Sequence, residues 1–166
     1  MSDDTPNRVR RLFLKGGAAC TLLPIKPGLA ETPPARGDYP SALLGNIRNL
    51  KIDVPVDVAY PDPSSPGLLV KLGQAVDGGA GPARDIVAFS TLCPHKGYPL
   101  IYAPSDKTLN CPEHRSRFDC EKSGMEIWGH ASQNLAQFAL RVDRRGDIYA
   151  EGVDELIYGR ISNILT

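Results

Sequence analysis

The sequence predicts an all-β fold built from many short strands. Short runs of alternating apolar and polar residues recur along the chain, and segments rich in turn-forming residues separate them. The 16 glycines and 15 prolines are scattered rather than clustered, which is typical of short strands and turns. With 166 residues, 42% of them hydrophobic, the chain can bury one core. It contains no internal repeat and no sign of a second domain.

The formal net charge is zero, with 19 basic and 19 acidic side chains. This balance gives no reason to expect nucleic acid or an anionic membrane surface as a partner. The sequence also lacks a nucleophile–base pair, a phosphate-binding loop and paired carboxylates in a recognisable motif. We therefore expect no catalytic site within this chain itself.

Residues 1–30 resemble a twin-arginine export signal. Arg10 and Arg11 are followed by Leu-Phe-Leu-Lys and then by an apolar run, while Val9 stands where such signals usually have serine or threonine. Pro24 interrupts the run, which is too short for a bilayer-spanning helix of about 20 residues. The resemblance implies export of a folded protein to the periplasm. Whether the leader is cleaved or kept as an anchor stays open.

An irregular N-terminal arm is expected over residues 31–45, followed by a folded domain over 46–166. Alternating apolar residues predict strands over 51–60, 67–73 and 85–91. The Pro-, Ser- and Gly-rich segments between these runs predict turns.

The second half of the chain continues the β pattern. A short strand is expected around residues 107–111, and residues 136–153 predict a hairpin about an Arg-Arg-Gly-Asp turn. Residues 154–165 could form a short helical turn, pack on a partner or remain a flexible end.

Two short motifs each set a cysteine beside a histidine. Cys93-Pro-His95 and Cys111-Pro-Glu-His114 are separated by 15 residues. Two thiolates and two imidazoles suit either tetrahedral zinc or a [2Fe-2S] cluster with both cysteines on one iron and both histidines on the other. Structural zinc sites usually take a cysteine pair from one arm and a histidine pair from the other. Here each arm supplies one of each, which favours the two-iron cluster.

The two arms resemble the signature of the Rieske [2Fe-2S] family, Cys-x-His-x-Gly followed by Cys-Pro-x-His-x-Ser. It is met by Cys93, His95, Gly97, Cys111, Pro112, His114 and Ser116. The resemblance covers roughly residues 45–153. It implies stacked antiparallel sheets with a small cluster-binding subdomain over about 90–133. It also implies four cluster ligands: Cys93, His95, Cys111 and His114. Cys20 lies in the leader, and Cys120 is expected to be a small buried residue.

The ligand set explains the function that the resemblance implies. Two ferric ions, two sulfides and two thiolates carry no net charge, so the cluster accepts an electron more easily than an all-cysteine cluster. Rieske centres accordingly lie at roughly −150 to +300 mV. Reduction also makes the imidazoles more basic, so electron and proton movement are coupled. We expect one-electron transfer, with the histidine side of the cluster near the surface.

The chain departs from the respiratory members of the family at three positions. Tyr98 and Glu113 occupy the places of two cysteines that form a disulfide between the loops in those proteins. Phe118 stands where they have a tyrosine that donates a hydrogen bond to a ligand sulfur, whereas Ser116 keeps the serine that donates to a bridging sulfide. Losing one donor predicts a lower midpoint potential. Phe118 can also be a core residue.

A third loop usually covers the cluster with Gly-Pro-Ala, and here Gly129-His130-Ala131 takes its place. We expect His130 to be a lid or partner-contact residue rather than a fifth ligand or proton relay. Lys96 and Gly97 are expected beside the cluster in the first arm. Trp128 is expected in the core or at an interface.

Within the family, the chain resembles the small subunit of arsenite oxidase. The leader and the stretches CPHKGYPL, CPEHRSRFD and GHASQNLAQ carry this resemblance. It implies a heterodimer with a large molybdopterin-containing subunit. Electrons would pass through the Rieske cluster to a cytochrome c or an azurin-like copper protein, and the arm and the C-terminal tail are candidates for contact with the large subunit. The alternative is a free-standing periplasmic Rieske ferredoxin that serves another oxidoreductase.

Overall fold

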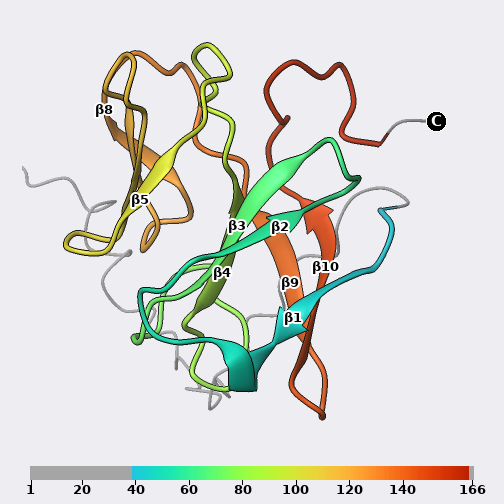
Figure 1. Ribbon diagram of the computed structural model, residues 1–166. Helices are drawn as coiled ribbons and strands as arrows, with labels where there is room; N and C mark the ends of the chain where they lie inside the picture. The colour runs from blue at the N-terminus through green and yellow to red at the C-terminus, as the bar shows by residue number, and fades with distance from the viewer. Residues whose placement is uncertain (1–38, 165–166) are drawn as a thin grey trace, which may run out of the picture. The chain divides into compact units, whose positions relative to one another are not determined.

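Ten β-strands and one short 3-10 helix make up the part of the chain described by the computed structural model, residues 39–164 (Figure 1). In chain order the elements are β1 (Ala42–Asn46), η2 (Ile47–Asn49), β2 (Val56–Ala59), β3 (Pro66–Lys71), β4 (Ile86–Ser90), β5 (Ile101–Ala103), β6 (Thr108–Asn110), β7 (Arg117–Asp119), β8 (Met125–Trp128), β9 (Phe138–Val142) and β10 (Asp147–Val153). The expected all-β fold is confirmed. The expected leader and residues 31–38 of the expected arm lie outside the described residues.

The strands form three antiparallel sheets, with the orders β1-β10-β9, β2-β3-β4 and β5-β6-β7-β8. β3 and β4 are central because side chains on both of their faces are buried. Leu69 and Ala88 belong to a core cluster shared with the sheet β1-β10-β9. Leu68 and Phe89 point the other way, into a cluster shared with the sheet β5-β6-β7-β8. Two faces therefore require two sets of apolar residues, which explains why every residue of β4 is buried.

The hairpin predicted over 136–153 is confirmed, with β9 and β10 paired from Val142 opposite Ile148 to Phe138 opposite Val153. The strands predicted over 67–73 and 85–91 appear as β3 and β4, and β6 corresponds to the short strand expected around 107–111. β5, β7 and β8 were not predicted. Strands of three or four residues are too short to show a period.

Two predictions in the first third of the chain are wrong. The irregular arm expected to reach residue 45 ends earlier, because β1 pairs with β10 and completes a sheet. Only the second half of the strand expected over 51–60 forms. Asp53 has φ of 58°, a left-handed conformation that a strand cannot contain, and Ile52 makes only an isolated parallel bridge to Lys71.

The C-terminal residues 154–164 form neither the expected helical turn nor a free tail. Ile157 is 1% exposed and belongs to the core cluster of the sheet β1-β10-β9. Arg160 pairs with Asp62 at 2.7 Å, so the segment is tied to the turn before β3. The burial of one apolar side chain and this ion pair bring the chain back onto its own domain.

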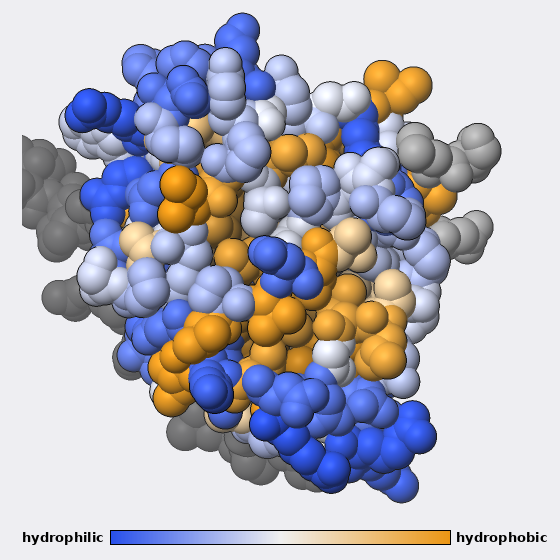
Figure 2. All heavy atoms as spheres, in the orientation of Figure 1, coloured by the Kyte–Doolittle hydropathy of each residue, from blue (hydrophilic) through white to orange (hydrophobic). Residues whose placement is uncertain are grey.

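Figure 2 shows apolar side chains on the face that carries β1 and β2. Four apolar side chains of the segment from β1 to β2 are exposed. They are Leu43, Ile52, Val54 and Val56.

No helix within the described residues 39–164 is long and apolar enough to cross a bilayer.

One ion pair links the sheet β5-β6-β7-β8, the expected cluster-binding sheet, to the rest of the fold. Lys107, in the turn between β5 and β6, donates to both carboxylate oxygens of Asp53 at 2.7 and 2.8 Å and to the carbonyl of Leu72 at 2.9 Å. Tyr102 on β5 donates to the same carboxylate at 2.8 Å. The hydrogen bond from Lys107 lowers the pKa of Asp53. Because both charged side chains are mostly shielded from water, the pair stabilises the attachment of this sheet.

We predict that Lys107→Met lowers the free energy of unfolding by about 2 kcal/mol, because Asp53 and the Leu72 carbonyl lose their cation. The deficit should shrink as pH falls below about 4, since a carboxyl with a depressed pKa loses its stabilising charge there. Urea titration at several pH values measures both effects. Lys122→Met, at an exposed lysine, is the control. An equal loss in both variants would contradict the role of the pair.

Candidate metal centre

The two cysteine–histidine motifs fold into loops with the same hydrogen bonds. In the first, which follows β4, the Cys93 N–H donates to the Tyr98 carbonyl at 2.9 Å and the Gly97 N–H donates to the Cys93 carbonyl at 2.7 Å. In the second, which follows β6, the Cys111 N–H donates to the Ser116 carbonyl at 2.8 Å and the Arg115 N–H donates to the Cys111 carbonyl at 3.1 Å. Each cysteine is therefore fixed through its backbone at the base of a tight loop.

Both loops turn through a left-handed residue four positions after the cysteine. In the first loop this is Gly97, with φ of 72°, and in the second it is Arg115, with φ of 62°. Glycine adopts this conformation without strain, whereas arginine rarely does. Arg115 was missed as a site residue. Aligning the two motifs on their cysteines would have found it opposite Gly97.

The loops bring the four expected ligands together as two pairs. Cys93 is 1% and Cys111 3% exposed, and both thiols are free. Burial raises the pKa of the Cys93 thiol, and the adjacent Cys111 thiol raises it further. The rings of His95 and His114 lie with centroids 4.8 Å apart, nearly perpendicular. Two plus two is the arrangement that a two-iron cluster needs.

The unsatisfied polar atom at this site fits such a cluster. Nδ1 of His95 is buried and has no hydrogen-bond partner, a costly state for an imidazole nitrogen unless a ligand binds it. Burial, and then the charges of His114 and Lys96, lower the pKa of His95. The lowered pKa favours the neutral ring, which is the form that binds metal. Iron at Nδ1 would satisfy the nitrogen.

The two pairs differ in their access to solvent. Both cysteines belong to the core cluster beneath the sheet β5-β6-β7-β8, whereas His114 is exposed. The thiolate side would therefore lie in the protein interior and the imidazole side at the surface. The path of an electron to another protein would therefore be shortest from the histidine side.

Ser116 joins the second ligand loop to the third loop. Its Oγ accepts the N–H groups of His130 at 3.0 Å and Ala131 at 3.1 Å, and the residue is fully buried. Gly129, with φ of 123°, packs so closely that a Cβ there would lie 2.3 Å from the Ser116 Cα. Because two N–H groups occupy the oxygen as acceptor, the O–H proton of Ser116 is free to donate to a further acceptor, as a bound cluster would be.

Other residues expected around the cluster lie at the surface. His130 is exposed, with its ring centroid 5.8 Å from that of His95, and Lys96 is also exposed. Trp128 is 68% exposed, so the expectation that it could be a core residue is wrong and the interface remains. Glu126 was missed. Its carboxylate accepts the Ala131 N–H at 2.8 Å, a contact that no sequence pattern indicates.

The two positions that hold a disulfide in respiratory Rieske proteins are occupied differently here. Tyr98 packs edge-on against the ring of His114, with centroids 5.8 Å apart, so an aromatic contact joins the two loops. Glu113 is exposed. Phe118 is fully buried in the same core cluster as both ligand cysteines, and Cys120 is fully buried as expected.

Comparison with known proteins finds a family whose match spans both ligand loops. The Rieske [2Fe-2S] domain family matches residues 73–139. The iodate reductase subunit IdrB of Denitromonas iodatirespirans is 43% identical over 159 residues, covering 93% of this chain and 85% of that protein. IdrB of Pseudomonas sp. (strain SCT) is 42% identical, covering 90% and 81%. The soluble domain of Rieske protein II (soxF) from Sulfolobus acidocaldarius superposes with a TM-score of 0.67 at 23% identity, covering 76% of this chain and 84% of that one.

These matches imply a Rieske-type [2Fe-2S] cluster as the cofactor. Cys93, His95, Cys111 and His114 would hold it, and Ser116 would donate to it.

We predict that Phe118→Tyr raises the midpoint potential by about 20–60 mV, the equivalent of one added hydrogen bond to the reduced cluster. Redox titration of the purified protein measures the shift. Phe118→Leu, which alters packing without adding a donor, is the control. An unchanged or lower potential in Phe118→Tyr would show that residue 118 does not reach the cluster.

We predict that Ser116→Ala lowers the midpoint potential by a similar amount, about 20–60 mV, because the reduced cluster loses a donor. The amide of His130 should also exchange faster, since it loses its acceptor, whereas the Ala131 amide keeps the Glu126 carboxylate. Redox titration and hydrogen exchange measure the two effects. Ser132→Ala, at an exposed serine of the same loop, should change neither.

Proposed function

Because this chain belongs to the Rieske [2Fe-2S] family, we propose that it is the electron-transfer subunit of an oxyanion-converting oxidoreductase, with iodate reductase as the first candidate. The observation that carries the proposal is the similarity to two iodate reductase subunits along nearly the whole chain. In this assignment the chain delivers electrons to a partner subunit that reduces iodate.

The residues of the site divide this work among themselves. A bound cluster supplies reversible one-electron transfer. Cys93 and Cys111 would hold the cluster from the core, where water is excluded. His95 and His114 would hold it from the surface side, to which a redox partner and a proton have access. Ser116 would stabilise added negative charge by donating a hydrogen bond.

The exposed apolar side chains beside the site support a partner subunit. Three residues of β8, the outer strand of its sheet, are exposed: Met125, Ile127 and Trp128. Tyr98 in the first ligand loop is 43% exposed. Aromatic side chains of this kind are enriched at protein interfaces. We propose that the partner is a large molybdopterin-containing subunit and that a cytochrome c or an azurin-like copper protein is the external redox partner.

Arsenite oxidase is the second candidate, favoured by the resemblance of the two ligand motifs and the third loop to its small subunit. The two enzymes differ in the direction of electron flow. Iodate reduction withdraws electrons from this chain, whereas arsenite oxidation supplies them. For either enzyme we propose a periplasmic location and export by the twin-arginine route.

The experiment is purification of the full-length holoprotein from its native cells with any chain that co-elutes, followed by visible and EPR spectra during substrate addition. If the proposal holds, iodate oxidises the dithionite-reduced cluster of the complex. Reduction of the oxidised cluster by arsenite would overturn it in favour of arsenite oxidase. A soluble monomer that responds to neither would instead support a free-standing ferredoxin.

We predict that Trp128→Ala weakens binding of the partner subunit roughly tenfold, because an exposed tryptophan beside the site is a typical interface hot spot. The EPR spectrum of the isolated variant should stay unchanged, since the side chain holds no ligand. Titration of labelled protein with the partner subunit measures the affinity. Leu43→Ala, on β1 in a different sheet, is the control. Equal affinity of the Trp128→Ala protein and wild type would remove Trp128 from the interface.

A further inference from the structure

The C-terminal strap, defined as residues 154–164, is held against the domain at both of its ends. At the start, the Asp154 carboxylate accepts the Gln137 N–H at 2.6 Å, and the Asp154 N–H donates to the Gln137 carbonyl at 3.1 Å. Near the end, the Arg160 guanidinium donates to both carboxylate oxygens of Asp62 at 2.7 and 3.1 Å. Arg160 also donates to Ser64 at 3.0 Å. These contacts span two of the three sheets.

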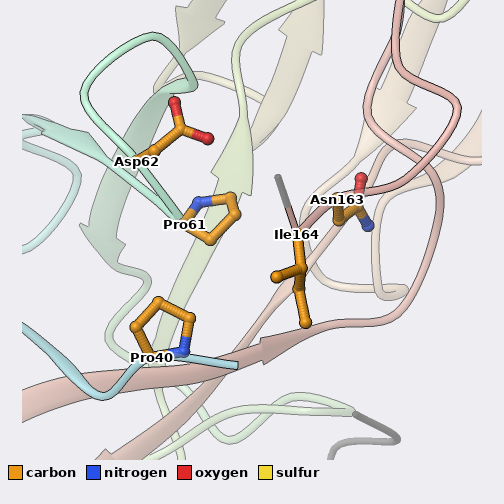
Figure 3. Close-up of a pocket in the computed structure, with 5 residues that line it drawn as sticks. All are labelled: Pro40, Pro61, Asp62, Asn163 and Ile164. Atoms are coloured by element: carbon orange, nitrogen blue, oxygen red, sulfur yellow. The ribbon is translucent and has the colours of Figure 1, made fainter. Parts of the chain in front are cut away.

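The strap also has its own internal bonds. The side chain of Asn163 accepts the Ile157 N–H at 2.9 Å and donates to the Glu155 carbonyl at 2.8 Å, which closes the segment into a loop. Figure 3 shows Asn163 and Ile164 across a small hollow from Pro61 and Asp62. With Ile157 buried in the core, the backbone on either side of it cannot move freely.

Next to the buried Ile157, Tyr158 reaches the first ligand loop. A Cβ built on Gly97 would lie 2.5 Å from Cε1 and 2.6 Å from Cδ1 of the Tyr158 ring. The ring therefore covers the Gly97 backbone directly, and only glycine leaves room for it. Gly97 is the residue whose N–H closes the loop on the Cys93 carbonyl. The strap thus packs against the turn at Gly97, which lies between the residues Cys93 and His95 and the residue Tyr98.

The same strap contacts the third loop. The side chain of Gln133 donates to the Leu156 carbonyl at 2.9 Å. Two of the three loops around the cluster site are therefore in contact with consecutive parts of one segment, at Leu156 and at Tyr158. That segment is itself tied to the core and to the turn before β3.

We propose that the C-terminal strap is a non-covalent brace for the cluster site, with Tyr158 as a positioning residue for the first ligand loop. Tight loops that lack a covalent link open locally at low cost. A ring packed on Gly97 raises that cost, because the loop cannot open without displacing Tyr158. The brace keeps His95 in its ligating position and slows loss of the cluster. It does not depend on which enzyme the chain serves, so the test uses this chain alone.

The test compares Tyr158→Ala with Tyr158→Phe in the full-length holoprotein. Hydrogen exchange at the Gly97 amide and bleaching of the cluster absorbance by an iron chelator should both be roughly fivefold faster in Tyr158→Ala. Tyr158→Phe should behave as wild type, because the ring and not the hydroxyl covers Gly97. The lines of the EPR spectrum should broaden only in the alanine variant.

The matched control is Tyr149→Ala, which removes a partly buried tyrosine from β10 in a sheet that holds no cluster ligand. Thermal unfolding corrects both variants for any loss of global stability. Arg160→Gln, which frees the strap from Asp62, should reproduce the Tyr158→Ala effect from a distance. The proposal is overturned if Tyr158→Ala and Tyr149→Ala show equal exchange at Gly97 and equal bleaching rates at matched stability.

Discussion

The whole site depends on two buried cysteines held by identical loops. In each loop the cysteine carbonyl accepts the N–H of the residue four positions later. The cysteine N–H donates to the carbonyl of the residue five positions later. This geometry turns the thiols inward and leaves the histidines, two or three positions further along, on the outer side. Burial raises the pKa of the Cys93 thiol, so forming a thiolate there is costly, and a metal–ligand bond would offset that cost.

The sheet β2-β3-β4 connects the ligand loops to the rest of the domain through packing. Its two faces supply Leu69 and Ala88 to one core cluster and Leu68 and Phe89 to the other. The cluster-binding sheet β5-β6-β7-β8 rests on the second face and is tied at its turn by Lys107 and Asp53. A change in the packing of β3 or β4 therefore reaches the ligand loops directly, since protein interiors have little free volume to absorb it.

The chain carries the Rieske ligand signature and holds its two ligand loops by non-covalent contacts. The interloop disulfide is replaced by the contact of Tyr98 with His114, and the C-terminal strap adds contacts from a segment distant in sequence. The motifs identify the cofactor, but they do not identify the enzyme. The resemblance to arsenite oxidase rests on the leader and on short stretches around the ligands. The similarity to iodate reductase subunits extends along nearly the whole chain, and function is decided by the partner's site rather than by this fold.

The sequence by itself determined the all-β class, the β9–β10 hairpin and the cofactor, because each depends on local signals: alternation, a turn motif and ligand spacing. Only the tertiary structure decided that residues 154–164 return to the domain, that Tyr158 covers Gly97 and that Trp128 is exposed. It also placed Arg115 in a left-handed turn and Glu126 beneath the third loop. The Arg115 turn and the Glu126–Ala131 hydrogen bond are local features. The contacts of residues 154–164 instead join residues far apart in sequence, and their free energy comes from the packing of the complete fold, so no local pattern encodes them.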